Sequence, residues 1–327
     1  MVDRDDLSAF SLAWRRNWRN GTLTNKRMRK HARRFAAALR SACVYLIIVA
    51  LTGCGGKSGV QKDPADTIGS VFSTTIDSAR TGAAYPLYIY VPASYASGTA
   101  TYPVIYATDG DAGFPPDGRF ANFRKILQRR GIDAILVGIG GTARRNKDFL
   151  LPGARAYHEF LTQELIPFVE SRVRADPNRR VLSGISFGGV FVVTSLFLEA
   201  PDTLYFSHYI SAEGSFFVPS FVEQERNFTS TIGTRNIPAT LILARAREGN
   251  KVQSQQFSMG GARGSPALSN LSLVPNEFTN HSEVDSFYRR MTARHYPGLV
   301  LIETSFSTDH IGTDNPSFED AMVRIFK

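Results

Sequence analysis

Cysteine is nearly absent from this chain of 327 residues, which contains only two. Both of them, Cys43 and Cys54, lie in the first sixth of the sequence, so the remainder has none. A body without cysteine excludes a disulfide framework, a thiolate nucleophile and a metal site built on sulfur ligands. We expect neither a metal centre nor a cofactor in it.

The body of the chain also lacks a net charge. The whole sequence has a formal charge of +9, but residues 1–53 hold eleven of the 38 basic and three of the 29 acidic side chains. That segment therefore accounts for +8 of the total, and residues 54–327 account for +1. Proteins that bind nucleic acids present an excess of Lys and Arg to the phosphates. The near-neutral body argues against a nucleic-acid partner.

No apolar run at the start of the chain is long enough to cross a membrane. Ten uncharged and mostly apolar residues, 42–51, follow a segment rich in Arg and Lys. A helix of that length is roughly 15 Å long, whereas a bilayer needs about 20 residues. A basic segment followed by a short apolar one is typical of an export signal. The run ends in Leu51-Thr52-Gly53-Cys54, which resembles a bacterial lipobox.

A lipobox implies cleavage before the cysteine and attachment of lipid to its sulfur. We expect residues 1–53 to be the leader, with translation starting at Met28, and Cys54 to be the lipidated residue. Gly55 follows the cysteine, whereas an Asp at this position would retain a lipoprotein in the inner membrane. Gly55 therefore implies the outer membrane, with the protein facing the periplasm. Residues 54–66 are polar and contain several glycines, which favours a flexible tether. Residues 67–327 remain as the folded domain.

Apolar runs alternate with amphipathic segments from residue 67 onward. Short apolar runs bounded by glycine favour strands of a parallel sheet covered on both faces, and a period of about 3.6 residues favours helices. We expect strands at residues 71–76, 85–91, 103–108, 134–139, 180–183, 205–210, 240–244 and 299–303, the first two forming an antiparallel pair. We expect helices at residues 120–130, 154–173, 189–198, 284–294 and 316–326. This alternation predicts one α/β domain.

Residues 248–280 fit neither period and are rich in Gly, Ser, Asn and Gln. A stretch this long without regular structure is unusual in a compact domain. Two interpretations stay open for it, a lid or binding loop and a surface insertion.

A Gly-x-Ser-x-Gly pattern, Gly184 to Gly188, follows a predicted strand and precedes a predicted helix. The bare pattern occurs often by chance, but a strand-to-helix turn is the context of a nucleophile elbow. There the glycines avoid collisions with neighbouring backbone, and the serine hydroxyl is lifted off the sheet. The helix amino terminus favours the negative charge that develops on the substrate. Ser186 is therefore the predicted nucleophile of an α/β-hydrolase fold.

A serine hydroxyl needs a base, and in this fold the base comes last along the chain. His310 follows the last predicted strand and precedes the final helix, at the carboxyl edge of the sheet. The other histidines of the body lie before the nucleophile, close behind it or at helix ends: His158, His208, His281 and His295. We therefore predict His310 as the base.

The acid of the triad should follow a strand at the same edge, where it holds the imidazole tautomer and stabilises its cation. Glu248 is the first carboxylate after the predicted strand 240–244 and is the preferred acid. Glu213 follows the preceding strand and is the alternative. Asp285 is more distant and falls on a predicted helix.

An oxyanion needs two N–H donors. One should be the backbone N–H of Phe187, which follows the nucleophile. The other should come from Asp111, in the loop after the strand 103–108. Asp109 and Asp111 lack the further ligands of a calcium loop and are interpreted as a turn.

These segments together resemble the putative esterase family, which includes esterase D, the enterochelin and ferric-siderophore esterases and the mycolyltransferases. The resemblance spans about residues 67–327 and is most specific between Tyr102 and Phe191. It is carried by Tyr102 to Asp111, Val137 to Gly140, Arg145, Asp148-Phe149, Phe160 to Phe168, the elbow and Ile210-Ser211. The resemblance implies Ser186, Glu248 and His310 as the triad, and the N–H groups of Asp111 and Phe187 as the oxyanion hole.

Two features depart from the family pattern. Ala212-Glu213-Gly214 stands where the family has Pro-Ser, which puts a carboxylate beside the site and keeps Glu213 open as the acid. The segment after Glu248 is longer than usual, which obscures the substrate pocket. We expect a carboxylic-ester hydrolase that forms an acyl-enzyme and acts on a small-molecule ester, such as a siderophore. An acyltransferase with the same triad and a non-catalytic binding lipoprotein are the alternatives.

Overall fold

The computed structural model describes residues 69–247 and 280–327. The predicted leader with Met28, the lipidation residue Cys54, the tether and the candidate acid Glu248 lie outside the described residues. The hypotheses that concern them, including the boundaries of the leader and tether, stay predictions. In the part of the chain that is described, no helix combines the length and the apolar character needed to span a membrane.

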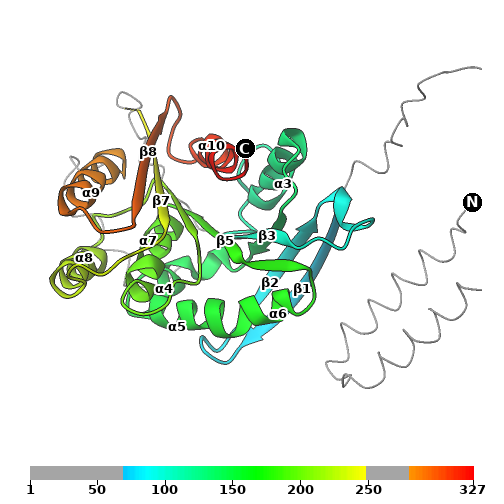
Figure 1. Cartoon of the computed structure of the whole chain (residues 1–327), viewed down its shortest axis with the longest axis horizontal. Helices are drawn as coiled ribbons and strands as arrows, with labels where there is room; N and C mark the ends of the chain where they lie inside the picture. Colours follow the sequence, from blue (N-terminus) through cyan, green and yellow to red (C-terminus); the bar gives the residue numbers. More distant parts are fainter. Residues whose placement is uncertain (1–68, 248–279) are drawn as a thin grey trace, which may run out of the picture. The chain divides into compact units, whose positions relative to one another are not determined.

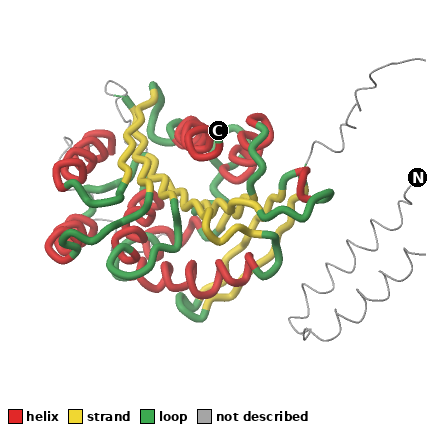
Figure 2. The backbone as a smooth tube through the Cα atoms, viewed as in Figure 1, coloured by secondary structure: helices red, strands yellow, loops and turns green. Residues whose placement is uncertain are grey.

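Eight strands form one twisted sheet (Figure 2). Their bounds are β1 Ser70–Ser78, β2 Ala83–Val91, β3 Tyr102–Ala107, β4 Ile135–Ile139, β5 Ala175–Ile185, β6 His208–Ala212, β7 Thr240–Ala246 and β8 Val300–Phe306. The strand order is β1-β2-β4-β3-β5-β6-β7-β8. β1 pairs antiparallel with β2, and β2 with β4, whereas all the other neighbours are parallel. The predicted antiparallel opening pair and the mostly parallel sheet are confirmed.

Helices cover both faces of this sheet (Figure 1). α3 (Arg119–Arg130) and α10 (Asp314–Phe326) lie side by side on one face. The other face carries α4 (Arg145–Asp148), α5 (Gly153–Glu159), η4 (Phe160–Leu165), α6 (Ile166–Glu170) and α7 (Phe187–Glu199). α8 (Pro219–Thr231) packs on α7, and α9 (Asn280–Arg294) packs on β7 and β8. The described residues also include two short turns of 3-10 helix, η2 (Ala93–Tyr95) and η3 (Thr142–Arg144).

Two apolar clusters hold the sheet and its loops together. Every residue of β3 and β4 is buried, as strands covered on both faces require. The larger cluster joins the strands to α3 and α10, where the rings of Phe123 and Phe318 stack with their centroids 3.7 Å apart. The smaller cluster lies at the carboxyl ends of the strands and consists of Ala112, Phe114, Ile185, Ala212 and Ala244, with Phe306 and Ile311 against them. It packs together the loops that carry the candidate site.

Two of the predicted segments differ most clearly from the structure. The helix expected at residues 154–173 is three consecutive segments, because a π-helical turn, η4, separates α5 from α6. The strand expected at residues 180–183 begins at Ala175. Tyr102 lies opposite Ala175 and Val104 opposite Arg180, so the residues between Ala175 and Arg180 bulge out of the ladder.

The sequence pattern did not predict α8. Its buried face combines Phe221 and Phe228 with the polar side chains of Gln224 and Glu225. Glu225 is buried because Arg290 and Arg294 of α9 bind its carboxylate, at distances between 2.7 and 2.8 Å. Polar residues on the inner face interrupt the apolar period from which such a helix is predicted.

Candidate active site

Ser186 is the single residue between the end of β5 and the start of α7. Its φ and ψ are 60° and −120°, a strained combination for a residue with a side chain. Gly184 and Gly188 make this turn possible. A Cβ at Gly184 would lie 2.3 Å from the carbonyl oxygen of Gly188, and a Cβ at Gly188 would lie 2.7 Å from Thr108 Oγ1. The strand-to-helix turn that the sequence predicted is therefore present at Ser186, and the role of this residue as nucleophile stays a prediction.

The two predicted oxyanion donors lie after neighbouring strands. Phe187 is the first residue of α7, so its N–H has no partner inside the helix. Asp111 follows β3, which lies next to β5 in the sheet. The N–H groups of Gly110 and Ala112 make backbone hydrogen bonds of 2.8 and 3.0 Å, whereas that of Asp111 makes none within the described residues. Both predicted donors are therefore available.

The carboxylate of Asp111 restrains this loop. Its Oδ2 accepts a hydrogen bond from the N–H of Gly141 at 2.9 Å. Its Oδ1 accepts one from the N–H of Thr142 at 3.1 Å and another from the Thr142 hydroxyl. Hydrogen bonds to a charged acceptor are stronger than neutral ones. The loop after β3 is thus tied to the loop after β4, which limits movement of the Asp111 N–H.

His310 lies between β8 and α10, as predicted, and its imidazole contacts a carboxylate. Nδ1 of His310 is 3.2 Å from Oε2 of Glu213, which directly follows β6. The Glu213 side chain is fully buried, and its Oε1 accepts a hydrogen bond from the N–H of Ala246 at 2.7 Å. A φ of 47° at Glu213 turns the chain sharply at this point. The structure therefore brings the base together with Glu213, the alternative acid.

His158 and His295 have other surroundings. Glu248, the acid that the sequence favoured, lies outside the described residues, and its role stays a prediction. His158 Nε2 is 2.8 Å from a carboxylate oxygen of Glu199, a pair that joins α5 to α7. His295 occupies a left-handed turn, with a φ of 49°, at the end of α9.

Asn280 contacts both members of the His–Glu pair. Its Nδ2 lies 3.1 Å from the carbonyl oxygen of Glu213 and 3.0 Å from Nδ1 of His310. A carbonyl oxygen only accepts hydrogen bonds, so the amide nitrogen must face it. The contact with Glu213 therefore orients the Asn280 side chain. An isolated asparagine carries no sequence pattern, and this residue was not predicted.

The Ser186 hydroxyl lies 3.4 Å from the hydroxyl of Ser215. Ser215 is buried and belongs to the same loop as Glu213. Among the described residues, no hydrogen bond joins Ser186 to His310. Catalytic hydrogen bonds of this kind are often loose before substrate binds and tighten in the complex.

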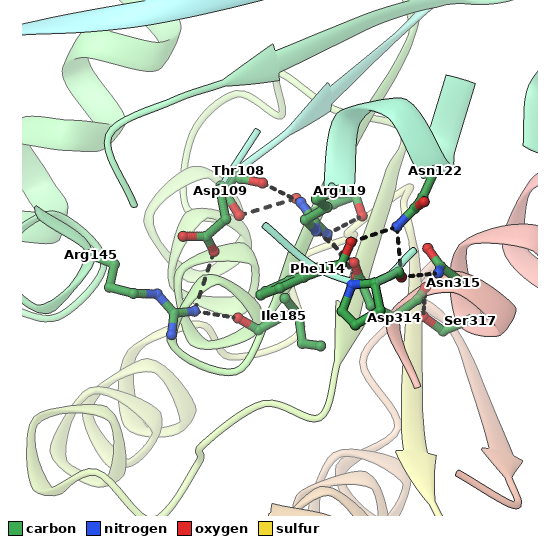
Figure 3. A network of polar contacts seen from close by, with 12 residues as sticks. Thr108, Asp109, Phe114, Arg119, Asn122, Arg145, Ile185, Asp314, Asn315 and Ser317 are labelled. Carbon is green, nitrogen blue, oxygen red and sulfur yellow. Dashed lines mark hydrogen bonds and ion pairs between the residues drawn. The ribbon is translucent and has the colours of Figure 1, made fainter. Parts of the chain in front are cut away.

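Two charged side chains lie beside the elbow (Figure 3). Arg145 donates a hydrogen bond to the carbonyl oxygen of Ile185 at 3.0 Å, is 3.3 Å from Asp109 Oδ2, and lies over the Phe187 ring. Burial raises the pKa of the Asp109 carboxyl, against the lowering effects of Arg145 and Arg119. Asp109 Oδ1 has no hydrogen-bond partner within the described residues. Arg145 thus holds the residue that precedes the nucleophile.

A cavity of about 590 Å³ lies elsewhere, between α7, α8 and the turn at Leu151-Pro152. Its lining residues include none of the candidate catalytic residues. We do not assign it to the reaction.

The sequence model of the family described as "Putative esterase" matches residues 78–232. The match includes the loop of Asp111, the elbow at Ser186 and Glu213. Residues 78–232 of this chain are therefore similar to the Putative esterase family.

A curated protein is similar in sequence to part of this chain. The ferri-bacillibactin esterase BesA of Bacillus subtilis (strain 168) is 29% identical over 177 residues, which cover 44% of this chain and 59% of BesA. The match thus spans less than two thirds of the length of this curated relative.

Two solved structures show the same fold. The IroE-like serine hydrolase from Shewanella oneidensis is 22% identical, with a TM-score of 0.61, over 79% of this chain and 80% of that chain. The siderophore hydrolase EstA from Aspergillus nidulans is 17% identical, with a TM-score of 0.59, over 85% of this chain and 98% of that chain. The predicted α/β-hydrolase fold, with its mostly parallel sheet between helices, is confirmed.

Proposed function

We propose that this chain is a serine ester hydrolase whose triad is Ser186, His310 and Glu213. The observation on which the proposal rests is the 3.2 Å contact between Glu213 Oε2 and His310 Nδ1, in a chain whose Ser186 occupies a nucleophile elbow. The order serine, acid, histidine along the chain is that of this fold. We assign the acid to Glu213 because it is the carboxylate with a described contact to the base.

The geometry supports the following reaction. Glu213 accepts the Nδ1 proton of His310, so that Nε2 carries the lone pair. In this tautomer the Asn280 NH2 group donates to the carbonyl oxygen of Glu213 and not to Nδ1. Nε2 takes the Ser186 proton while Oγ attacks the ester carbonyl carbon, and the N–H groups of Asp111 and Phe187 stabilise the oxyanion. The alkoxide leaves with the proton from Nε2, and the acyl group remains on Ser186. Water then gives a proton to Nε2 of His310 and attacks the acyl carbon. As the bond to Ser186 Oγ breaks, Nε2 returns the proton to Oγ, and the acid is released.

The names of the relatives point to the substrate class. BesA is described as a ferri-bacillibactin esterase and EstA as a siderophore hydrolase. We therefore propose a small-molecule ester of the siderophore type as the substrate. From the lipobox alone, we also propose that lipid on Cys54 holds the enzyme at the outer membrane, facing the periplasm.

Covalent labelling tests the nucleophile directly. A fluorophosphonate probe should label the wild-type protein, and Ser186→Ala should abolish the labelling. The same variant should lose at least about a thousandfold in ester cleavage, measured on a panel that includes a ferric catecholate siderophore. Ser215→Ala is the matched control, since it removes the neighbouring hydroxyl and should keep the label. Labelling of Ser186→Ala at the wild-type level would exclude Ser186 as the nucleophile.

A further inference from the structure

A buried ion pair lies beneath the site and joins two of its loops (Figure 3). Nε of Arg119 donates to Oδ2 of Asp314 at 2.8 Å, and Nη2 donates to Oδ1 at 3.0 Å. The two side chains are 0% and 3% exposed. Asp314 follows the loop of His310 and begins α10, whereas Arg119 follows the loop of Asp111 and begins α3. The pair therefore connects the base loop with the oxyanion loop.

The same guanidinium contacts the strands on which the site is built. Its Nη1 donates a hydrogen bond to the carbonyl oxygen of Thr108, at the end of β3. Its Nη2 lies 3.4 Å from Ser183 Oγ, on β5 just before the elbow. The backbone N–H of Arg119 also donates to the carbonyl oxygen of Ala112 at 2.9 Å, which closes the oxyanion loop. Arg119 thus contacts residues next to three of the four segments that carry the proposed catalytic groups, and the loop of Glu213 is the fourth.

Hydrogen bonds close the turns between Asp309 and Asp314, the segment that contains His310. The N–H and hydroxyl of Thr313 donate to the carbonyl oxygen of Asp309 at 3.1 and 2.8 Å. The N–H of Asp314 donates to the carbonyl oxygen of Ile311 at 3.1 Å. His310 lies inside this series of tight turns, so a displacement of Asp314 would displace the imidazole.

Holding α3 to α10 does not by itself require the ion pair. The stacked rings of Phe123 and Phe318 already join these helices, and Glu319 binds both Arg129 and Arg130. Apolar residues of similar volume often stabilise a protein as well as a buried ion pair does. The guanidinium of Arg119 adds directed contacts at the first turn of each helix. The loops of Asp111 and His310 lead into these first turns.

We propose that Arg119 and Asp314 are positioning residues, which set the placement of His310 relative to the Asp111 N–H and the elbow. This proposal rests on the proposed ester hydrolysis. Neither residue touches the substrate, so their loss should lower kcat with little change in KM. A misplacement of about 1 Å can cost about 100-fold in rate.

The test replaces the whole pair in the double variant Arg119→Met/Asp314→Leu. Because no charge is left unpaired, Tm should stay close to the wild-type value. We expect kcat for p-nitrophenyl acetate to fall about 100-fold, KM to change by less than about threefold, and the rate of fluorophosphonate labelling to fall with kcat. Asp314→Asn, which keeps the shape and removes the charge, should give a smaller loss in kcat.

The matched control is Arg180→Met/Glu170→Leu. Arg180 and Glu170 form a similar two-bond pair, with distances of 2.6 and 2.8 Å, toward the amino end of β5. This control should keep the wild-type kcat. Wild-type kcat in the folded Arg119/Asp314 double variant, or an equal loss in the control, would overturn the proposal.

Two further outcomes are decisive. If the double variant does not fold, Asp314→Asn with wild-type Tm and wild-type kcat would overturn the proposal. Wild-type protein that reacts with neither probe nor ester would overturn the proposed function and this inference together. An inactive double variant together with an active wild-type protein would support this inference and the proposed function, so failure of the inference can be told from failure of the function.

Discussion

Glu213→Gln converts one oxygen of the proposed acid into an NH2 group, and the structure dictates which one. Oε1 of Glu213 accepts the N–H of Ala246 at 2.7 Å, and a backbone N–H only donates, so the amide oxygen must stay there. The NH2 group is then placed on Nδ1 of His310, where the second carboxylate oxygen lies at 3.2 Å in the wild type. Because the NH2 group only donates, Nδ1 must present its lone pair and Nε2 must carry the proton.

That tautomer cannot accept the Ser186 proton. We expect kcat to fall about 10⁴-fold, the loss that an amide causes at the acid position of a serine-protease triad. The fold should survive, because Gln has the same shape and a neutral amide costs less to bury than a charge. The assay is kcat for p-nitrophenyl acetate together with Tm.

Two further variants serve as comparisons for the kcat of Glu213→Gln. Glu199→Gln makes the same change in another buried carboxylate that contacts a histidine, His158, and should keep kcat within about threefold. Glu248→Gln tests the acid that the sequence favoured. If Glu213→Gln kept more than about a tenth of the wild-type kcat while Glu248→Gln lost activity, the acid would be Glu248 and the reasoning from the buried contact would be refuted.

Three further predictions concern burial, packing and export. Burial raises the pKa of Asp109, so the charge of this carboxylate opposes folding increasingly as the pH rises above the ordinary pKa of a carboxyl group. Asp109→Asn should therefore raise Tm more near pH 7 than near pH 4. A lower Tm of the variant near pH 7 would mean that attraction by Arg145 outweighs burial. Gly188→Ala would place a Cβ 2.7 Å from Thr108 Oγ1 and should lower the free energy of unfolding, measured in urea, by about 1–3 kcal/mol. A Cβ at Gly113 would have no atom within 4 Å, so Gly113→Ala should change this free energy by less than about 0.5 kcal/mol. Equal losses in the two variants would contradict the packing argument. A fatty-acid analogue supplied to a bacterial host should label the wild-type protein and not Cys54→Ser, and equal labelling of both would exclude lipid attachment at Cys54.

The elbow and the α/β architecture could be predicted from the sequence because they depend on local rules. Gly184, Ser186 and Gly188 satisfy steric conditions that act within five residues, between a strand and a helix. Uniformly apolar runs predicted the buried parallel strands in the same way. His310 could be placed because the order of the triad along the chain is a property of the fold.

Only the tertiary structure shows that Glu213 contacts His310. β6 and β7 end at the same edge of the sheet, so a carboxylate after either strand satisfies the sequence rule. The turn at Glu213, with a φ of 47°, and the hydrogen bond from Ala246 bring this carboxylate to His310. The partners Glu213 and His310 are 97 residues apart, and Arg119 and Asp314 are 195 apart. Spacing along the chain carries information about contacts within a few residues, whereas pairings at these separations are decided by how the whole sheet packs with its helices.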